Sequence, residues 1–347
     1  MQAVVQSPFA SGESIASIFK ADFTELSLQE IVETSKYREL LSKLKNSLKT
    51  DLHTHLGGAI PIEFIEKYSI GQEYAEFIRF IEKLRSGMDY SEGFKAFSMI
   101  GKVLNSNKRI EEAAYEFCRS QNSDNVTFTE LRTGLKRLDG NFEDYLGAVI
   151  AGLEKGMKDY PVRVTLVLSL RRETSIEDAN EIIDLAIKYR GQLLTGIDVS
   201  GESIKGDCSG IFGALKRAKS NGLPITLHIG ENSLESPEQQ LRELTEIQPS
   251  RVGHAVHLCP EARAWIEDKQ IVVEACIRSA LSVSMITKPS QHPALELFKK
   301  GHPVVFCTDD STLFGDLSEE LALVACLCNL SVTEVVEMQK RALAYAF

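Results

Sequence analysis

Residues 50–58 read TDLHTHLGG and place two of the chain's seven histidines, His53 and His55, two positions apart. The run predicts a β-strand over 50–55. Side chains at positions i and i+2 of a strand point to the same face, so we expect the two imidazoles to converge. Two converging imidazoles form half of a metal site. The alternative is a pair of histidines on a solvent-facing surface.

The rest of the chain alternates between short β-rich runs and helical segments such as 176–190 and 211–221. Eight strands that alternate with helices are typical of a (β/α)8 TIM barrel, which is the α/β fold that we predict. An open doubly wound sheet is the alternative. The predicted strands are 50–55, 126–132, 162–169, 194–199, 224–229, 251–255, 271–276 and 303–309.

Several of these predicted strands end in ionisable residues. The fifth ends in HIGE, which contains His228 and Glu231. The sixth ends in GHA, which contains His254, and the eighth ends in TDD, which contains Asp309 and Asp310. In a barrel these strand ends surround one mouth. Imidazoles combined with a carboxylate suit Zn²⁺, with water completing its coordination shell. The fourth strand ends in GIDVSGE and has no lysine to bridge two ions, so we expect one metal ion.

Position along the chain also suggests a task for each remaining group. His254 lies on the strand after His228 and could hold or deprotonate the metal's water. Glu231 is not needed as a ligand and could move a proton. Asp310 follows Asp309, so its side chain should point elsewhere, towards a substrate. The alternatives are a salt bridge for Glu231 and a helix N-cap for Asp310.

The composition narrows the classes of partner. A net charge of −10 disfavours nucleic acids and anionic membrane surfaces. The odd number of cysteines and the lack of a CxxC pair indicate free thiols, and we interpret Cys307 as core filling. No run approaches the roughly 20 apolar residues of a membrane span, and the N-terminal segment lacks the features of a signal peptide. We therefore expect a cytoplasmic protein with a small-molecule substrate; a monomer is compatible with this.

The chain divides into an N-terminal extension, 1–47, and a barrel, 48–347. Residues 1–25 are rich in serine and small residues, which indicates an irregular segment. One helix is expected from Ser27, which has capping-box spacing to Glu30. The extension should pack on the barrel; a partner-binding arm is the alternative. The apolar face of this helix should comprise Tyr37, Leu40, Leu41, Leu44 and Leu48.

The stretch 61–121 after the first strand is helical and long enough for an inserted lid over the substrate. Phe94 and Phe97 within it would either cover the sugar of a bound ligand or pack in the core.

The ordered strings TDLHTHLGGAI, FTELR (128–132), GIDVSGE, LHIGE, RVGHA and TDDSTLFG resemble the adenosine deaminase family of zinc-dependent (β/α)8 hydrolases. The likeness runs from about residue 48 to residue 347. It implies one zinc ion per chain and hydrolytic deamination of a 6-aminopurine. The zinc ligands that it implies are His53, His55, His228 and Asp309.

The same resemblance implies the other roles. Glu231 would protonate the purine N1, and His254, assisted by Asp309, would orient and deprotonate the attacking water. Asp310 would bond to N7, and the backbone N–H of Gly201 would meet N3. The substrate-binding residues that it implies are Gly201, Asp310, Gly57 and His55.

Departures from the family pattern leave the substrate open. Gly57 stands where many adenosine-acting members carry an acidic residue, and a glycine would not repel a 5′-phosphate. Ala255 stands where glycine is usual, and the family's CPxSN motif is CIRSA at 276–280. Adenosine or 2′-deoxyadenosine is the first substrate hypothesis, in purine salvage. N6-methyl-AMP or a related nucleotide is the second and adenine the third; an inactive binding protein is the non-enzyme alternative.

Overall fold

The computed structural model describes residues 23–347, and the expectations for residues 1–22 lie outside this range. Eight parallel strands pair in sequence order from first to last, each with the next, which confirms the predicted barrel strands. They are β1 (Lys49–His55), β2 (Val126–Thr133), β3 (Arg163–Arg171), β4 (Leu194–Ser200), β5 (Ile225–Ile229), β6 (Arg251–His254), β7 (Val272–Ala275) and β8 (Val304–Phe306).

The barrel closes where β1 meets the residues that follow β8. Thr54 and Asp309 form a parallel bridge. The His55 backbone N–H donates to the Asp309 carbonyl, and the Asp309 N–H donates to the His53 carbonyl, each at 2.9 Å. This seam makes the sheet a barrel and excludes the open doubly wound alternative.

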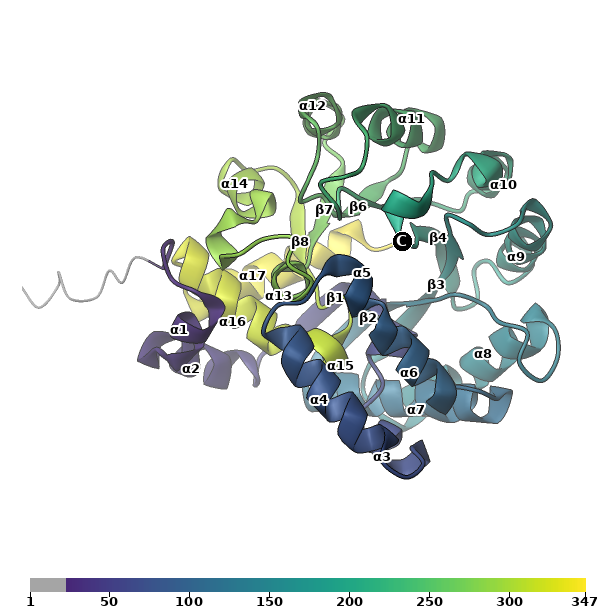
Figure 1. Ribbon diagram of the computed structural model, residues 1–347, viewed down its shortest axis with the longest axis horizontal. Helices are drawn as coiled ribbons and strands as arrows, with labels where there is room; N and C mark the ends of the chain where they lie inside the picture. Colours follow the sequence, from purple (N-terminus) through teal and green to yellow (C-terminus); the bar gives the residue numbers. More distant parts are fainter. Residues whose placement is uncertain (1–22) are drawn as a thin grey trace, which may run out of the picture.

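A ring of helices surrounds the strands (Figure 1). Its members include α7 (Asn107–Ser123), α8 (Phe142–Asp159), α9 (Ile176–Lys188), α10 (Phe212–Ser220), α11 (Pro237–Ile247), α12 (Pro260–Asp268), α14 (Pro293–Lys299), α16 (Leu317–Cys328) and α17 (Val332–Ala342). Several begin with a residue type that favours helix N-caps, such as Asn141 before α8 and Ser331 before α17.

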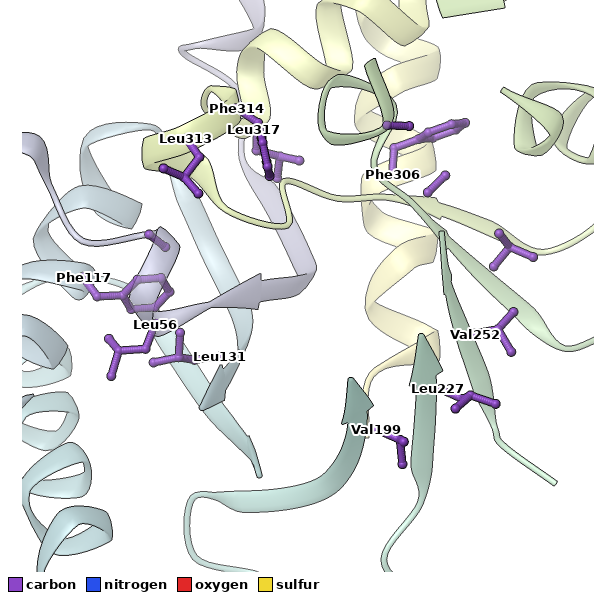
Figure 2. Close-up of a cluster of buried hydrophobic side chains, with 14 of the residues drawn as sticks. Leu56, Phe117, Leu131, Val199, Leu227, Val252, Phe306, Leu313, Phe314 and Leu317 are labelled. Atoms are coloured by element: carbon purple, nitrogen blue, oxygen red, sulfur yellow. The ribbon is translucent and has the colours of Figure 1, made fainter. Parts of the chain in front are cut away.

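The main hydrophobic core lies between the strands and the helices, because alternate strand residues face outwards. Figure 2 shows Val199, Leu227 and Val252 on neighbouring strands of this layer. The inward-facing residues are largely polar, as the burial of Glu130, Asp198 and other charged side chains shows. Cys307 is buried in a small apolar cluster, as expected, and all seven cysteines, which lie within residues 23–347, are free thiols.

The N-terminal extension contains two helices, α1 (Leu28–Glu33) and α2 (Ser35–Leu44), so the prediction of one helix was wrong. The Ser27–Glu30 capping box is present. Thr34 interrupts the pattern with extended backbone, φ −68° and ψ 147°, and its hydroxyl accepts from the Tyr37 N–H at the start of α2. Leu48 is 64% exposed and lies outside both helices, whereas α2 packs against α16.

The stretch after β1 is helical, as predicted. It contains α3 (Ile62–Tyr68), α4 (Glu73–Arg85), α5 (Tyr90–Gly93) and α6 (Lys95–Val103), followed by the ring helix α7. Helices α4, α5 and α6 lie across one face of the barrel in Figure 1. Within residues 23–347, no single helix is long and apolar enough to cross a membrane; α16 and the segment Val332–Tyr345 meet those criteria only as a pair bent by 118°.

Candidate metal centre and active site

Four residues that the sequence analysis selected meet at the C-terminal mouth of the barrel. His53, His55, His228 and Asp309 each offer one ligand atom, and these atoms lie within 4.8 Å of one another. The His55 Nε2 atom is 3.3 Å from His53 Nε2 and 3.2 Å from His228 Nε2. The Asp309 Oδ1 atom is 3.4 Å from His53 Nε2 and 3.5 Å from His55 Nε2.

These four separations are in the range expected for donor atoms that share one divalent metal ion. With metal–ligand distances of about 2.0–2.1 Å, neighbouring ligand atoms of a tetrahedron lie ~3.3 Å apart. The second nitrogens of two rings are already bonded. His53 Nδ1 is 2.9 Å from Glu274 Oε2, and His228 Nδ1 is 3.1 Å from the Val199 carbonyl oxygen. Such bonds place the ring proton on Nδ1 and leave the Nε2 lone pair for a metal.

A buried ionic network supports these bonds from inside the barrel. Glu274 accepts from Arg132 and, at 2.7 Å, from Arg251 Nε. Burial opposes its charge, but the two arginines outweigh this effect and hold its pKa well below the ordinary value. Asp198 lies 2.9 Å from His228 Nδ1 and is bonded to Arg132. Both histidines are therefore oriented by fixed carboxylates.

Sequence reasoning missed this network. Its signal was present as charged residues inside otherwise apolar strands: Glu274 within VVEA, Arg251 at the start of RVGH, and Asp198 within GIDV. Such residues are rarely buried unless they are paired.

The remaining predicted groups line the same cavity, whose volume is about 250 Å³. His254 Nε2 is 3.6 Å from Glu231 Oε1. Burial lowers the pKa of His254 well below its ordinary value, so its ring is neutral and can accept a proton. Burial, followed by the charge of Glu235, raises the pKa of Glu231 well above its usual range. Burial and the neighbouring Asp309 do the same for Asp310.

Five buried polar atoms of residues that line this cavity have no hydrogen-bond partner within residues 23–347. They are Tyr90 Oη, Arg132 Nε, Glu231 Oε2, His254 Nδ1 and Asp310 Oδ1. Buried polar atoms are almost always bonded to protein or to a ligand. The cavity is therefore suited to a ligand with several polar atoms on its edges. Tyr90, from α5, was not predicted.

The two glycines after His55 have different roles. Residues Leu56–Gly58 form a turn of 3-10 helix, and neither glycine has positive φ. Freedom to adopt positive φ is therefore not the reason for these two glycines. A Cβ atom on Gly58 would lie 1.8 Å from Asp310 Oδ1, whereas one on Gly57 would meet nothing within 4 Å. Gly58 makes room for Asp310, and Gly57 lines the cavity.

Three residues at the mouth adopt left-handed backbone: His254 (φ 62°), Ala255 (φ 55°) and Asp309 (φ 64°). Non-glycine residues in this region are uncommon and cluster at functional sites. Gly201, also in the cavity wall, has φ 94°, which glycine adopts without strain.

Ser279 is retained from the altered CIRSA motif and donates to Asp309 Oδ2 at 2.6 Å. Phe94 and Phe97 both line the cavity, as one of their two expected placements required, and Phe94 also packs against the core.

The fold and the cluster define a barrel hydrolase of the metal-dependent kind. The sequence model described as adenosine deaminase matches residues 48–347, and the chain belongs to this family of hydrolytic deaminases.

Curated relatives include the N6-mAMP deaminase of Arabidopsis thaliana, 30% identical over 74% of this chain and 79% of that protein. The adenosine deaminase-like protein of Drosophila melanogaster is 26% identical over 88% and 92%. An adenosine deaminase of Clostridium botulinum is 26% identical over 82% and 89%.

Solved structures agree. The Arabidopsis N6-mAMP deaminase matches with a TM-score of 0.80 at 30% identity, covering 88% of this chain and 95% of that one. An Arabidopsis relative solved in complex with GMP matches with a TM-score of 0.79 at 30% identity, covering 88% and 94%.

Proposed function

We propose that this chain is a zinc-dependent deaminase of 6-aminopurine 5′-monophosphates, with N6-methyl-AMP or AMP as substrate. The observation that carries the reaction type is the convergence of His53, His55, His228 and Asp309 beside a cavity with an unpartnered acid and base. A zinc ion bound by these residues would lower the pKa of a water molecule to about 7.

The protein's own groups divide the proton transfers. The neutral His254 accepts a proton from the attacking water, and the protonated Glu231 donates one to the purine N1, which makes C6 electrophilic. Asp310, also protonated, donates to N7. His254 passes the proton that it accepted to the 6-amino nitrogen, which leaves as ammonia, or as methylamine from an N6-methyl substrate. The second proton of the water returns to Glu231 as the carbonyl forms at C6, and N1 keeps the proton that Glu231 donated.

The cation Lys136 favours a nucleotide over a nucleoside. It follows β2, and Gly57 follows the neighbouring strand β1; both line the cavity. The surrounding protein, followed by the Arg171 guanidinium, lowers the pKa of Lys136. Among residues 23–347 it forms no salt bridge that would neutralise it. A 5′-phosphate would supply the missing anion, and the glycine at position 57 places no carboxylate nearby to repel it.

Adenosine or 2′-deoxyadenosine, placed first by the sequence analysis, is the second candidate. The 26% identity to Clostridium adenosine deaminases over 82% of this chain favours it about as strongly as the plant relative favours the nucleotide. A cytoplasmic role in purine salvage belongs to this proposal, as does the choice of zinc over another divalent ion.

An ultraviolet assay of the zinc-loaded protein tests the proposal. The substrates are adenosine, 2′-deoxyadenosine, adenine, AMP and N6-methyl-AMP. We expect the two nucleotides to have the highest kcat/KM. Lys136→Gln should lower kcat/KM for them by about 10- to 100-fold, the range for a lost charge-assisted bond, and leave adenosine unchanged. Lys158→Gln, on the outside of α8, is the matched control.

Two results would contradict the proposal. Turnover of none of the five compounds would refute deamination, and a preference for adenosine that Lys136→Gln does not change would restore the nucleoside. Glu231→Gln should keep zinc and lose at least about 10²-fold in kcat, as expected for a general acid.

A further inference from the structure

A second buried glutamate holds the loop that carries Glu231. Glu235 is 7% exposed. Its carboxylate accepts the backbone N–H groups of Gly230 (2.9 Å), Glu231 (2.9 Å) and Asn232 (3.2 Å). The Ser203 hydroxyl, from the segment after β4, donates to it at 2.6 Å. The carboxylate therefore fixes three successive peptide units beside the candidate acid.

The two glutamates differ in their hydrogen-bond donors. Glu235 receives bonds on both oxygens, whereas Glu231 Oε2 has no partner. Two carboxyl groups in one dry site do not both ionise readily, and donors stabilise the ionised form of whichever group they reach. Glu235 is therefore tied to the loop backbone through both oxygens, whereas the Glu231 carboxyl group faces the cavity.

The other charges around Glu231 come from several elements. Asp198 of β4 and Asp309 after β8 add negative charge, and Arg172 after β3 opposes it. Arg172 is, however, paired with Glu243 and bonded to the His228 carbonyl. The neutral His254 of β6 and Tyr90 of α5 complete the surroundings.

We propose that Glu235 is a positioning residue for Glu231: its carboxylate fixes peptide units 230–232 and places a carboxylate group beside the Glu231 side chain. Glu235 itself touches neither the cavity nor the metal ligands. This inference rests on the proposed function, because the acid that it serves is the one assigned there.

The first measurement does not need turnover. Hydrogen exchange of the zinc-loaded protein, read on peptides covering 229–235, should be about tenfold faster in Glu235→Gln, because an amide presents an N–H where the carboxylate presented an acceptor. Ser203→Ala removes one neutral donor and should leave the exchange rate unchanged. Unchanged exchange in Glu235→Gln would overturn the positioning role, whether or not the protein proves to be a deaminase.

The second measurement is the pH profile of kcat on the best substrate of the ultraviolet assay. Glu231 acts in its protonated form, so activity falls as pH rises through its pKa. Removing the Glu235 charge lowers that pKa. We expect the alkaline limb to move down by about one pH unit in Glu235→Gln, so that kcat at a pH on that limb falls about tenfold while KM changes little.

Glu235→Asp separates the two effects. It keeps the charge but withdraws the oxygens by one methylene group, so it should keep the alkaline limb and still speed exchange. A loss of kcat in Glu235→Gln that is uniform over pH, or that accompanies loss of zinc, would show a merely structural role and overturn the proposal. An unchanged pH profile would overturn it equally.

Discussion

The metal side of the cavity is formed by His53, His55, His228 and Asp309. The sugar side, where the proposed 5′-phosphate would lie, is formed by Gly57, Lys136 and Arg171. The two sides are built differently. On the metal side, His53 and Asp309 are buried, and the Asp309 N–H donates to the His53 carbonyl. The His53 side chain is bonded to Glu274, and the Asp309 side chain accepts from Ser279. On the sugar side, Gly57 lies in the 3-10 turn after β1, Lys136 lies in the loop after β2, and Arg171 is the last residue of β3. Lys136 and Arg171 are exposed, and Lys136 forms no hydrogen bond or ion pair with residues 23–347.

The difference separates chemistry from substrate choice. Strand ends that are locked by many contacts hold the reacting groups in one geometry, which preorganised catalysis requires. Loop residues with few contacts can be exchanged without disturbing that geometry. Substitutions on the two sides should therefore differ in size and in kind.

The largest effect is expected from His53→Ala. It removes one zinc donor and leaves Glu274 buried without its imidazole partner, so we expect loss of stoichiometric zinc and at least about a 10³-fold loss in kcat. Metal analysis and kinetics check this. His257→Ala, a half-buried histidine outside the cavity, should keep both; an intact ion in His53→Ala would relocate the site.

The paired variants Gly58→Ala and Gly57→Ala come next. The added methyl group at 58 would collide with Asp310, whereas the one at 57 meets open space. Gly58→Ala should lower kcat/KM by about 10²-fold, the effect of displacing a reacting group by ~1 Å. Gly57→Ala should stay within about twofold, because nothing is displaced. Equal losses in the two variants would contradict the separate roles of these glycines.

Gly57→Asp tests the sugar side. A carboxylate fits there sterically and would repel a 5′-phosphate. We expect the ratio of kcat/KM for nucleotide to that for nucleoside to fall by roughly 10- to 100-fold, with zinc content unchanged. A constant ratio would mean that position 57 does not face the 5′ end of the substrate.

A smaller effect is expected from Tyr90→Phe. The hydroxyl has no hydrogen-bond partner among residues 23–347, so its removal should leave the melting temperature unchanged or slightly raised. If the hydroxyl bonds to the substrate, kcat/KM should fall by about 2- to 10-fold, the usual range for one neutral hydrogen bond. Unaltered kinetics would show that the phenol contacts no substrate atom.

The smallest effect should be a gain of stability in Ala255→Gly. Alanine is strained at φ 55°, and glycine is not. After the greater entropy of glycine in the unfolded chain is subtracted, we expect a stabilisation of about 0.5–1 kcal/mol, measured by denaturant unfolding. Ala214→Gly inside α10 is the control and should destabilise by about 1 kcal/mol.

The barrel and the cluster at its mouth were predictable from sequence, because strand ends in a barrel converge whatever lies between them. His228 and Asp309 could be placed together on that rule alone. The Glu274–His53 bond could not, because it depends on which residues face each other across the barrel interior. Lys136 belongs to no sequence motif, and it comes near Gly57 only because β1 and β2 are neighbours in the barrel.

The break between α1 and α2 shows a second limit. The apolar spacing from Tyr37 to Leu44 continues a helical pattern, and a pattern of apolar residues does not mark where the backbone leaves the helix. Thr34 takes extended backbone and bonds to Tyr37 N–H and to the Ile31 carbonyl. Threonine competes with helix formation in this way, so a two-helix reading was available from its position.

The seam between β1 and the residues after β8 links closure of the barrel to binding of a metal ion. The peptide units that close the ring belong to His53, His55 and Asp309, which also present three of the four cation donors. Separation of β1 from the residues after β8 would move the donor atoms apart. Binding of one ion by these donors would hold the two segments together. Metal binding and closure of the barrel should therefore stabilise each other, so the free energy of unfolding should depend partly on the bound ion.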